Sequence, residues 1–141
     1  MLKVELVPVM LVDNVFHKCA DGFRIAAKKA SSDVDAAYLH QQCRSGNAML
    51  VVAHDDEVVG GALVIRYENW CGKNVMHTLG LWCSAKGAYE LLESKKIELA
   101  RMSGATSMIA EARASKAGLC GFKRRYPKAK ILRYVIEVEL D

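Results

Sequence analysis

Two apolar runs in the middle of the sequence constrain the fold of this chain more than any other feature. They cover residues 48–53 and 58–65, and the polar residues 54–57 separate them. Apolar runs of this length joined by a short polar turn are typical of two paired strands. Both are far shorter than the roughly 18 residues that a membrane helix needs. We therefore expect residues 49–53 and 58–67 to form a β-hairpin.

The pattern of apolar and polar residues on either side of this hairpin predicts further strands and helices. Strands are expected over residues 4–9, 75–83, 106–111 and 130–140, and helices over residues 12–29, 33–44, 86–103 and 115–120. Residues 31–33 supply N-cap chemistry for the second helix, and residues 69–74 are expected to form a loop. Two adjacent glycines at 60–61 predict a bulge or a close approach by other backbone. This order of elements predicts one α/β domain with a mixed sheet.

Length and composition narrow the class of protein. The chain has 141 residues, of which 52% are hydrophobic and 26% are charged, so a disordered or collagen-like chain is excluded. Residues 1–14 lack a basic start followed by a long apolar block, so no secretory signal is expected. The five cysteines form no CxxC motif and are expected to be reduced, without a metal site. We expect a single cytoplasmic domain over residues 1–141 that does not enter a membrane.

One segment concentrates the positive charge of the chain. Residues 123–133 contain six basic residues and no acid, which leaves a net charge of −2 for the rest of a chain whose total is +4. Such a segment is a candidate site for a nucleotide phosphate or a nucleic-acid backbone. A solvated turn between two elements is the alternative, and it is favoured over nucleic-acid binding. The six residues are Lys123, Arg124, Arg125, Lys128, Lys130 and Arg133.

The junction between the strand over 75–83 and the helix over 86–103 carries the most information about function. Its sequence, LGLWCSAKGAYELL over residues 79–92, runs from a strand through small residues directly into a long helix. Unpaired amide groups and the positive end of the dipole at a helix start form an anion site, which small side chains leave accessible. A glycine that merely tightens the turn and an N-cap role for Ser84 are the alternatives.

Taken together, residues 49–140 resemble the GNAT superfamily of N-acyltransferases, which use acetyl-CoA. The hairpin VVAHDDEVVGGALVI, the junction SAKGAY, the helix ELLESKKIELARMSGA, the Gly-Phe of CGFKRR and the terminal VIEVELD carry the resemblance. It implies a mixed, mostly antiparallel central sheet flanked by about four helices. It also implies an acyl-CoA-dependent transfer of an acetyl group to a primary amine of a small molecule or a protein. Short GNAT-like domains encoded by bacteriophages are similar in style.

The resemblance also implies a cofactor site. The backbone of residues 81–83 would hold the pantetheine arm, and the loop that follows would bind the pyrophosphate, with Lys86 near the phosphates. Ser84 stands where the family has Arg or Gln, and Ala117 stands where it has a tyrosine that acts as general acid. The residues implied for acetyl-CoA binding are Leu81, Trp82, Cys83, Ser84, Ala85, Lys86, Gly87, Ala88 and Tyr89.

Candidate catalytic residues follow from the same resemblance, in which the base comes from the fourth or fifth strand. His77 and Glu111 occupy those strands, and Tyr126, like Tyr89, is a candidate replacement for the missing acid. A structural role for His77, an ion pair between Glu111 and Arg113, and packing of the tyrosine are the alternatives. Cys83 and Cys120 are expected to be inert thiols.

Two other functions remain open. The departures at Ser84 and Ala117 fit a catalytically inactive GNAT-fold binding or virion protein. The basic segment over 123–133 fits a nucleic-acid-directed, base-modifying protein. A homodimer is compatible with each of these hypotheses.

Overall fold

The computed structural model describes residues 1–30, 34–56, 58–111, 116–133 and 136–140. The chain has two compact units, Met1–Glu111 and Ala112–Asp141, which are described separately. The first unit contains a five-stranded sheet in the order β1-β2-β3-β4-β5. Its strands are β1 (Lys3–Val7), β2 (Met49–Asp55), β3 (Val58–Trp70), β4 (Lys73–Cys83) and β5 (Ser107–Ile109). The first four pair antiparallel and β5 pairs parallel with β4, so the prediction of a mixed, mostly antiparallel sheet is confirmed.

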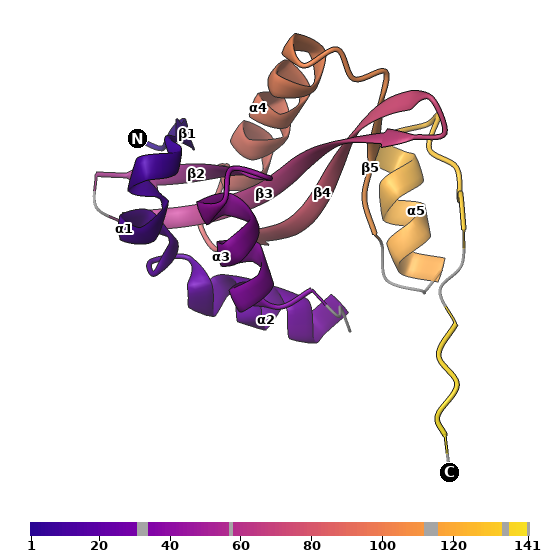
Figure 1. The fold of residues 1–141 in the computed structure, drawn as a ribbon, viewed down its shortest axis with the longest axis horizontal. Coiled ribbons are helices and arrows are strands. Elements are labelled where there is room, and N and C mark those ends of the chain that lie inside the picture. Colours follow the sequence, from indigo (N-terminus) through magenta and orange to yellow (C-terminus); the bar gives the residue numbers. More distant parts are fainter. Residues whose placement is uncertain (31–33, 57, 112–115, 134–135, 141) are drawn as a thin grey trace. The chain divides into compact units, whose positions relative to one another are not determined.

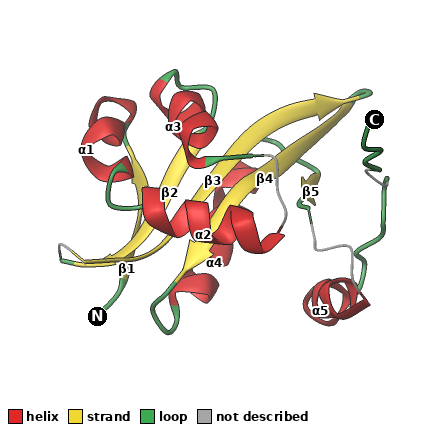
Figure 2. Cartoon of the chain, turned by 90° about the horizontal axis from the view of Figure 1, so that it is seen from below, coloured by secondary structure: helices red, strands yellow, loops and turns green. Residues whose placement is uncertain are grey.

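Helices cover both faces of this sheet (Figures 1 and 2). A 3-10 turn and three helices lie on one face, and a single long helix lies on the other. The elements on the first face are η1 (Val9–Leu11), α1 (Val12–Phe16), α2 (Ala20–Ala30) and α3 (Ala36–Arg44), and the helix on the second face is α4 (Ala88–Met102). Successive residues of β2 therefore enter two different cores: Leu50 and Val52 pack with α1–α3, whereas Val51 and Ala53 pack with α4.

The central hairpin and its bulge are confirmed. Strands β2 and β3 pair from Met49↔Ile65 to Asp55↔Val58, and the register shifts between Ala53 and His54, opposite Gly60. A Cβ at Gly60 would lie 2.5 Å from the Cβ of Ala85, which belongs to the turn before α4. The glycine therefore allows the start of β3 to approach that turn closely.

The predicted loop over residues 69–74 is wrong, because β3 and β4 continue through most of it. Only Cys71 and Gly72 form the turn, with φ of 53° and 85°. Positive φ at both positions is the geometry of a two-residue hairpin turn whose twist matches that of the strands. The side-chain oxygen of Asn69 accepts a hydrogen bond from the Gly72 N–H at 3.0 Å.

The expected helices exist, but several boundaries differ. The long helix over 12–29 is two helices, since α1 ends at Phe16 and α2 begins at Ala20. Helix α3 begins at Ala36, and Asp35 caps it by accepting a hydrogen bond from the Tyr38 N–H at 2.8 Å. The N-cap expected at 31–33 lies outside the described residues.

The second unit contains α5 (Lys116–Arg125), which is longer than the helix expected over 115–120. The strand predicted over residues 130–140 is wrong, because the described residues 130–133 and 136–140 have no strand structure. Alternation predicts the faces of a strand but does not supply the neighbour that a strand needs for its hydrogen bonds. The apolar side chains of Ile136 and Val138 are 82% and 76% exposed. Among the helices that the structure describes, none could cross a bilayer.

Candidate functional site at the opening of the sheet

Strand β4 changes its surroundings along its length. Its first half lies between β3 and β5, and the last of its three pairs with β5 is His77↔Ile109. Residues 78–83 continue to pair with β3, but within the described residues they have no partner on the β5 side. The register with β3 also shifts between Val64 and Ile65, which pair with Gly80 and Thr78, so β4 carries an extra residue at Leu79, two positions after His77. A bulge of this kind bends and twists the strand, which explains why the sheet opens here.

The turn after β4 is held against β3 by its own amide groups. The N–H groups of Ser84 and Ala85 both donate to the carbonyl of Gly60, at 2.8 and 2.9 Å. The Ser84 hydroxyl donates to the same oxygen at 3.3 Å. These two amides, which were expected to face a diphosphate, are therefore occupied, and Ser84 is not the N-cap of the helix.

The start of α4 lies further along the chain. Gly87 is the N-cap, with φ of 85° in the left-handed region that favours glycine. The N–H of Ala88 donates to the carbonyl of Ala85 at 3.2 Å. Within the described part of the chain, the amides of Lys86 and Gly87 have no hydrogen-bond acceptor, and a Cβ on Gly87 would meet no atom within 4 Å. Lys86 and Gly87 therefore offer amides that are accessible to an anion, beside the exposed Lys86 side chain.

The side chains before this turn have structural positions. Leu81 packs in the α4 core, and Trp82 packs in the opposite core, where a side chain at Gly22 of α2 would collide with its ring. Residues 81 and 82 could therefore contact a ligand mainly through their backbone. Burial, followed by the negative charges of Glu90 and Glu93, raises the pKa of the Cys83 thiol. This shift argues against Cys83 as a nucleophile.

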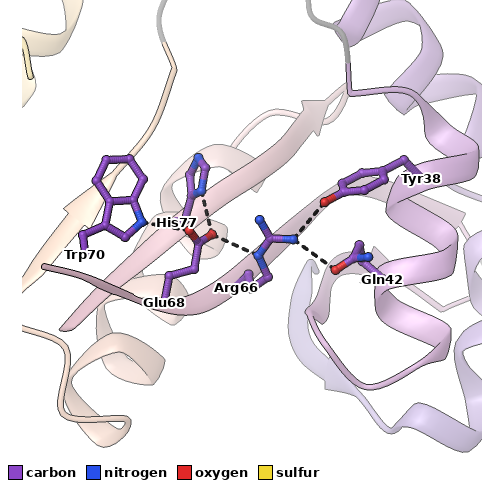
Figure 3. Close-up of polar contacts among 6 residues, drawn as sticks. All are labelled: Tyr38, Gln42, Arg66, Glu68, Trp70 and His77. Atoms are coloured by element: carbon purple, nitrogen blue, oxygen red, sulfur yellow. Dashed lines mark hydrogen bonds and ion pairs between the residues drawn. The ribbon is translucent and has the colours of Figure 1, made fainter. Parts of the chain in front are cut away.

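His77 lies at the point where the sheet opens, and its side chain is in an organised polar environment (Figure 3). The residue is only 8% exposed. Its Nδ1 lies 2.7 Å from Oε2 of Glu68 on the neighbouring strand β3. The indole of Trp70 meets the imidazole edge-on, with ring centroids 5.9 Å apart.

Glu68 is the centre of this environment. Its carboxylate also accepts hydrogen bonds from Nε1–H of Trp70 at 2.8 Å and from Nε–H of Arg66 at 2.9 Å. Burial alone would raise the pKa of Glu68, but the hydrogen bonds from Trp70, His77 and Arg66 together hold that pKa below its usual value. Glu68 is therefore a carboxylate at neutral pH.

Arg66 extends the contacts to the helical layer. Its Nη1 donates to the hydroxyl of Tyr38 at 2.9 Å and to Oε1 of Gln42 at 3.0 Å, both on α3. We call the six residues of Figure 3 the His77 network: Tyr38, Gln42, Arg66, Glu68, Trp70 and His77. Of these, the sequence analysis identified only His77. The spacing of 66, 68 and 70 places those residues on one face of a strand, but it does not indicate which residue of another strand they meet.

The other two catalytic candidates have different surroundings. Glu111 is exposed and lies two residues beyond the end of β5, and its alternative partner Arg113 lies outside the described residues. Tyr126 belongs to the second unit, where its N–H donates to the carbonyl of Phe122 at 2.7 Å. The basic side chains of Lys123, Arg124 and Arg125 form the exposed last turn of α5.

Other parts of the described chain offer less chemistry. The described residues contain no group of three or more His, Cys, Asp and Glu side chains that could hold a metal ion. Two hollows of about 250 and 190 Å³ lie beside the end of β1, and both are lined by Leu6, Val7 and Pro8. Neither hollow includes a residue of the turn before α4. The opening after His77 is therefore the best candidate site.

Comparisons with known proteins agree with this geometry. No family model matches the chain, and no curated protein is significantly similar to it in sequence. An aminoglycoside acetyltransferase from an uncultured soil metagenomic sample has a similar structure, with a TM-score of 0.74 and 17% identity over 99% of this chain and 97% of that one. A ribosomal-protein-alanine N-acetyltransferase from Brucella melitensis gives a TM-score of 0.69 and 16% identity, over 99% of this chain and all of that one.

A third similar structure contains acetyl-CoA, the ligand that the resemblance implies for the junction before α4. This acetyltransferase from Clostridium acetobutylicum was crystallised with acetyl-CoA, and it gives a TM-score of 0.68 and 9% identity over 99% of this chain and 96% of that one. These likenesses show that the chain has the GNAT fold, a mixed α/β fold that these acetyltransferases share.

Proposed function

We propose that this protein is an acyl-CoA-dependent N-acetyltransferase that transfers an acetyl group to a primary amine of a small molecule or a protein. The observation that carries the proposal is the opening of β4 from β5 directly before a helix start with accessible amides. The same fold, over almost the whole chain, occurs in acetyltransferases.

The accessible amides define how this chain would bind the diphosphate of acetyl-CoA. Lys86 and Gly87 supply two N–H donors and one ammonium group, whereas Ser84 and Ala85 hold the turn against Gly60. Ser84 anchors the loop in this arrangement, and Lys86 is the residue that supplies positive charge near the diphosphate. The edge of β4 over residues 78–83 offers backbone groups for the pantetheine arm.

The chemistry requires an acceptor amine without its proton. The acetyl-CoA thioester would supply the acyl group. His77 is the proposed base, because an imidazole nitrogen can accept a proton and this one lies at the opening. Glu111 and Tyr126 remain candidates for proton transfer. The names of two similar proteins mention an aminoglycoside and a ribosomal-protein alanine, which supports an amine acceptor of either size class.

Calorimetry with acetyl-CoA tests the binding step, using two matched glycine variants. Gly87 and Gly104 flank α4, have φ of 85° and 81°, and both face open space. Glutamate at either position therefore costs a similar backbone strain of about 1–2 kcal/mol. Only Gly87→Glu places a negative charge against the diphosphate, so it should weaken binding about tenfold or more, whereas Gly104→Glu should bind like the wild type.

Two results would contradict the proposal. No heat from the wild type at millimolar acetyl-CoA would remove the transferase assignment. If both glycine variants weakened acetyl-CoA binding equally, the diphosphate would not bind at the start of α4.

A non-catalytic GNAT-fold protein is the second candidate, and the serine at position 84 and the alanine at position 117 favour it. Acetyl-CoA binding without transfer to any member of a broad amine panel would support this candidate. Acetylation of an amine, detected by release of free CoA, would exclude it.

A further inference from the structure

We infer that Glu68 is a positioning residue that fixes the imidazole of His77 with its Nδ1–H on the carboxylate and its Nε2 available as the proton acceptor. The role of this arrangement in catalysis rests on the proposed function. The arrangement itself can be measured without any substrate.

The tautomer follows from the chemistry of the two partners. An ionised carboxylate can only accept hydrogen bonds, so the 2.7 Å contact requires a hydrogen on Nδ1 of His77. A neutral imidazole carries one hydrogen, and its lone pair is then on Nε2. Within the described residues, Nε2 of His77 has no hydrogen-bond partner, yet it is not among the side-chain atoms that are buried without one. It is therefore accessible to a proton donor from outside.

The carboxylate is itself held in place from several directions. Trp70 donates to Oε1 of Glu68, while Arg66 and His77 both donate to Oε2. Arg66 in turn is anchored to α3 through Tyr38 and Gln42. Among the residues that the structure describes, Glu68 and Arg66 are the charged groups that face His77, and the two α3 partners are neutral. A base held in this way needs no reorientation before it accepts a proton.

This pattern of donors decides which variant is informative. Trp70 donates to one carboxylate oxygen of Glu68, whereas Arg66 and His77 both donate to the other. A glutamine could keep its amide oxygen toward Arg66 and His77 and lose only the Trp70 contact, so Glu68→Gln need not release the imidazole. Glu68→Leu offers no acceptor to any of the three donors, and we expect it to abolish the fixed orientation of His77.

Nitrogen NMR of the full chain with labelled histidine reads the tautomer directly. In the wild type, neutral His77 should carry its hydrogen on Nδ1, and Glu68→Leu should shift it to Nε2 or to a mixture. Asp13→Asn is the control, because it removes a histidine–carboxylate contact of similar length, His40 to Asp13 at 2.8 Å, away from the sheet opening. This control should leave the His77 signals unchanged.

The wild-type spectrum keeps the inference falsifiable if Glu68→Leu fails to fold. A wild-type His77 with its hydrogen on Nε2 overturns the inference, and so does an unchanged Nδ1–H tautomer in a folded Glu68→Leu variant.

Kinetics then separate positioning from a structural role. With any amine that is acetylated, Glu68→Leu should lower kcat at least about tenfold with little change in KM. A folded variant that loses stability but keeps the wild-type kcat contradicts positioning. If no amine is acetylated, the transferase proposal fails, while the NMR result still decides the arrangement at His77.

Discussion

The two faces of the sheet both bury charged groups, but they do so in different ways. On the face covered by α1–α3, the His77 network joins α3, β3 and β4. On the face covered by α4, Lys96 and Glu93 form a 2.7 Å ion pair three residues apart on one helix, with side chains 7% and 9% exposed. Nζ of Lys96 also lies 3.4 Å from Oγ1 of Thr78 on β4.

The difference between these two sets of contacts indicates different roles. The pair lies within one helical turn, neutralises two charges locally and also contacts β4 through Thr78. The His77 network joins residues as far apart in the sequence as Tyr38 and Arg66, which are 28 positions apart. It therefore positions one side chain relative to three elements at once. We expect substitutions in the pair to change stability alone, and substitutions in the network to change the site as well.

The largest expected effect is at the α4 pair. Glu93→Leu leaves the buried ammonium of Lys96 with Thr78 as its polar neighbour, and we expect a loss of about 3–5 kcal/mol in the free energy of unfolding. Urea denaturation of the wild type and the variant measures this loss.

The double variant Glu93→Leu with Lys96→Met is the matched control. Replacing both partners of a buried pair by apolar residues is often neutral or stabilising, so we expect a stability within about 1 kcal/mol of the wild type. A double variant as unstable as Glu93→Leu alone would mean that packing, rather than charge, dominates at this site.

A smaller effect on stability is expected for Glu68→Gln, at about 1–3 kcal/mol at neutral pH. The pKa of Glu68 is lowered in the folded protein, so its contribution is complete above the usual value of 4.5 and is lost as the pH falls through the folded pKa. The difference between wild type and Glu68→Gln should therefore narrow when urea denaturation is repeated well below pH 4.5. An equal difference at acidic and neutral pH would show that the charge of Glu68 is not responsible.

The sequence predicts the sheet and the helices that cover it well, because these elements depend on local patterns of apolar and polar residues. The hairpin of β2 and β3 is recognisable from two apolar runs and a polar turn. Helix α4 is recognisable from its spacing, although Gly87 delays its start to Ala88. The prediction of a terminal strand is wrong because it needed more than a local pattern. Residues 130–140 alternate like a strand, but a strand also needs a neighbouring strand, which the local sequence does not indicate.

The candidate site shows the same limit. The junction before α4 is visible in the sequence as small residues between a strand and a helix, but the occupation of two of its amides depends on Gly60, which lies 24 positions earlier. His77 is recognisable as a strand histidine. Its contact with Glu68 depends on the register of β3 and β4, which pairs Arg66 with His77 and places Glu68 diagonally beside it. The pairing of Glu93 with Lys96 is missed because a hydrophobic pattern counts only apolar residues.

The smallest expected effect is at Lys95. Its ion pair on the same helix is in contact with solvent and serves as a reference for the buried pair of Glu93 and Lys96. Nζ of Lys95 lies 3.4 Å from Oε1 of Glu98, again three residues away on α4, but the two side chains are 24% and 56% exposed. An ion pair in contact with solvent contributes little, and alanine is a better helix former than lysine, so Lys95→Ala should change the free energy of unfolding by less than about 0.5 kcal/mol. The same urea experiment at low and high salt measures it. Both pairs lie on the same helix with the same spacing, so they differ in burial. If Lys95→Ala lowered the free energy of unfolding as much as Glu93→Leu, burial would not explain the difference between the two pairs. The contrast between the two faces would then rest on the His77 network alone.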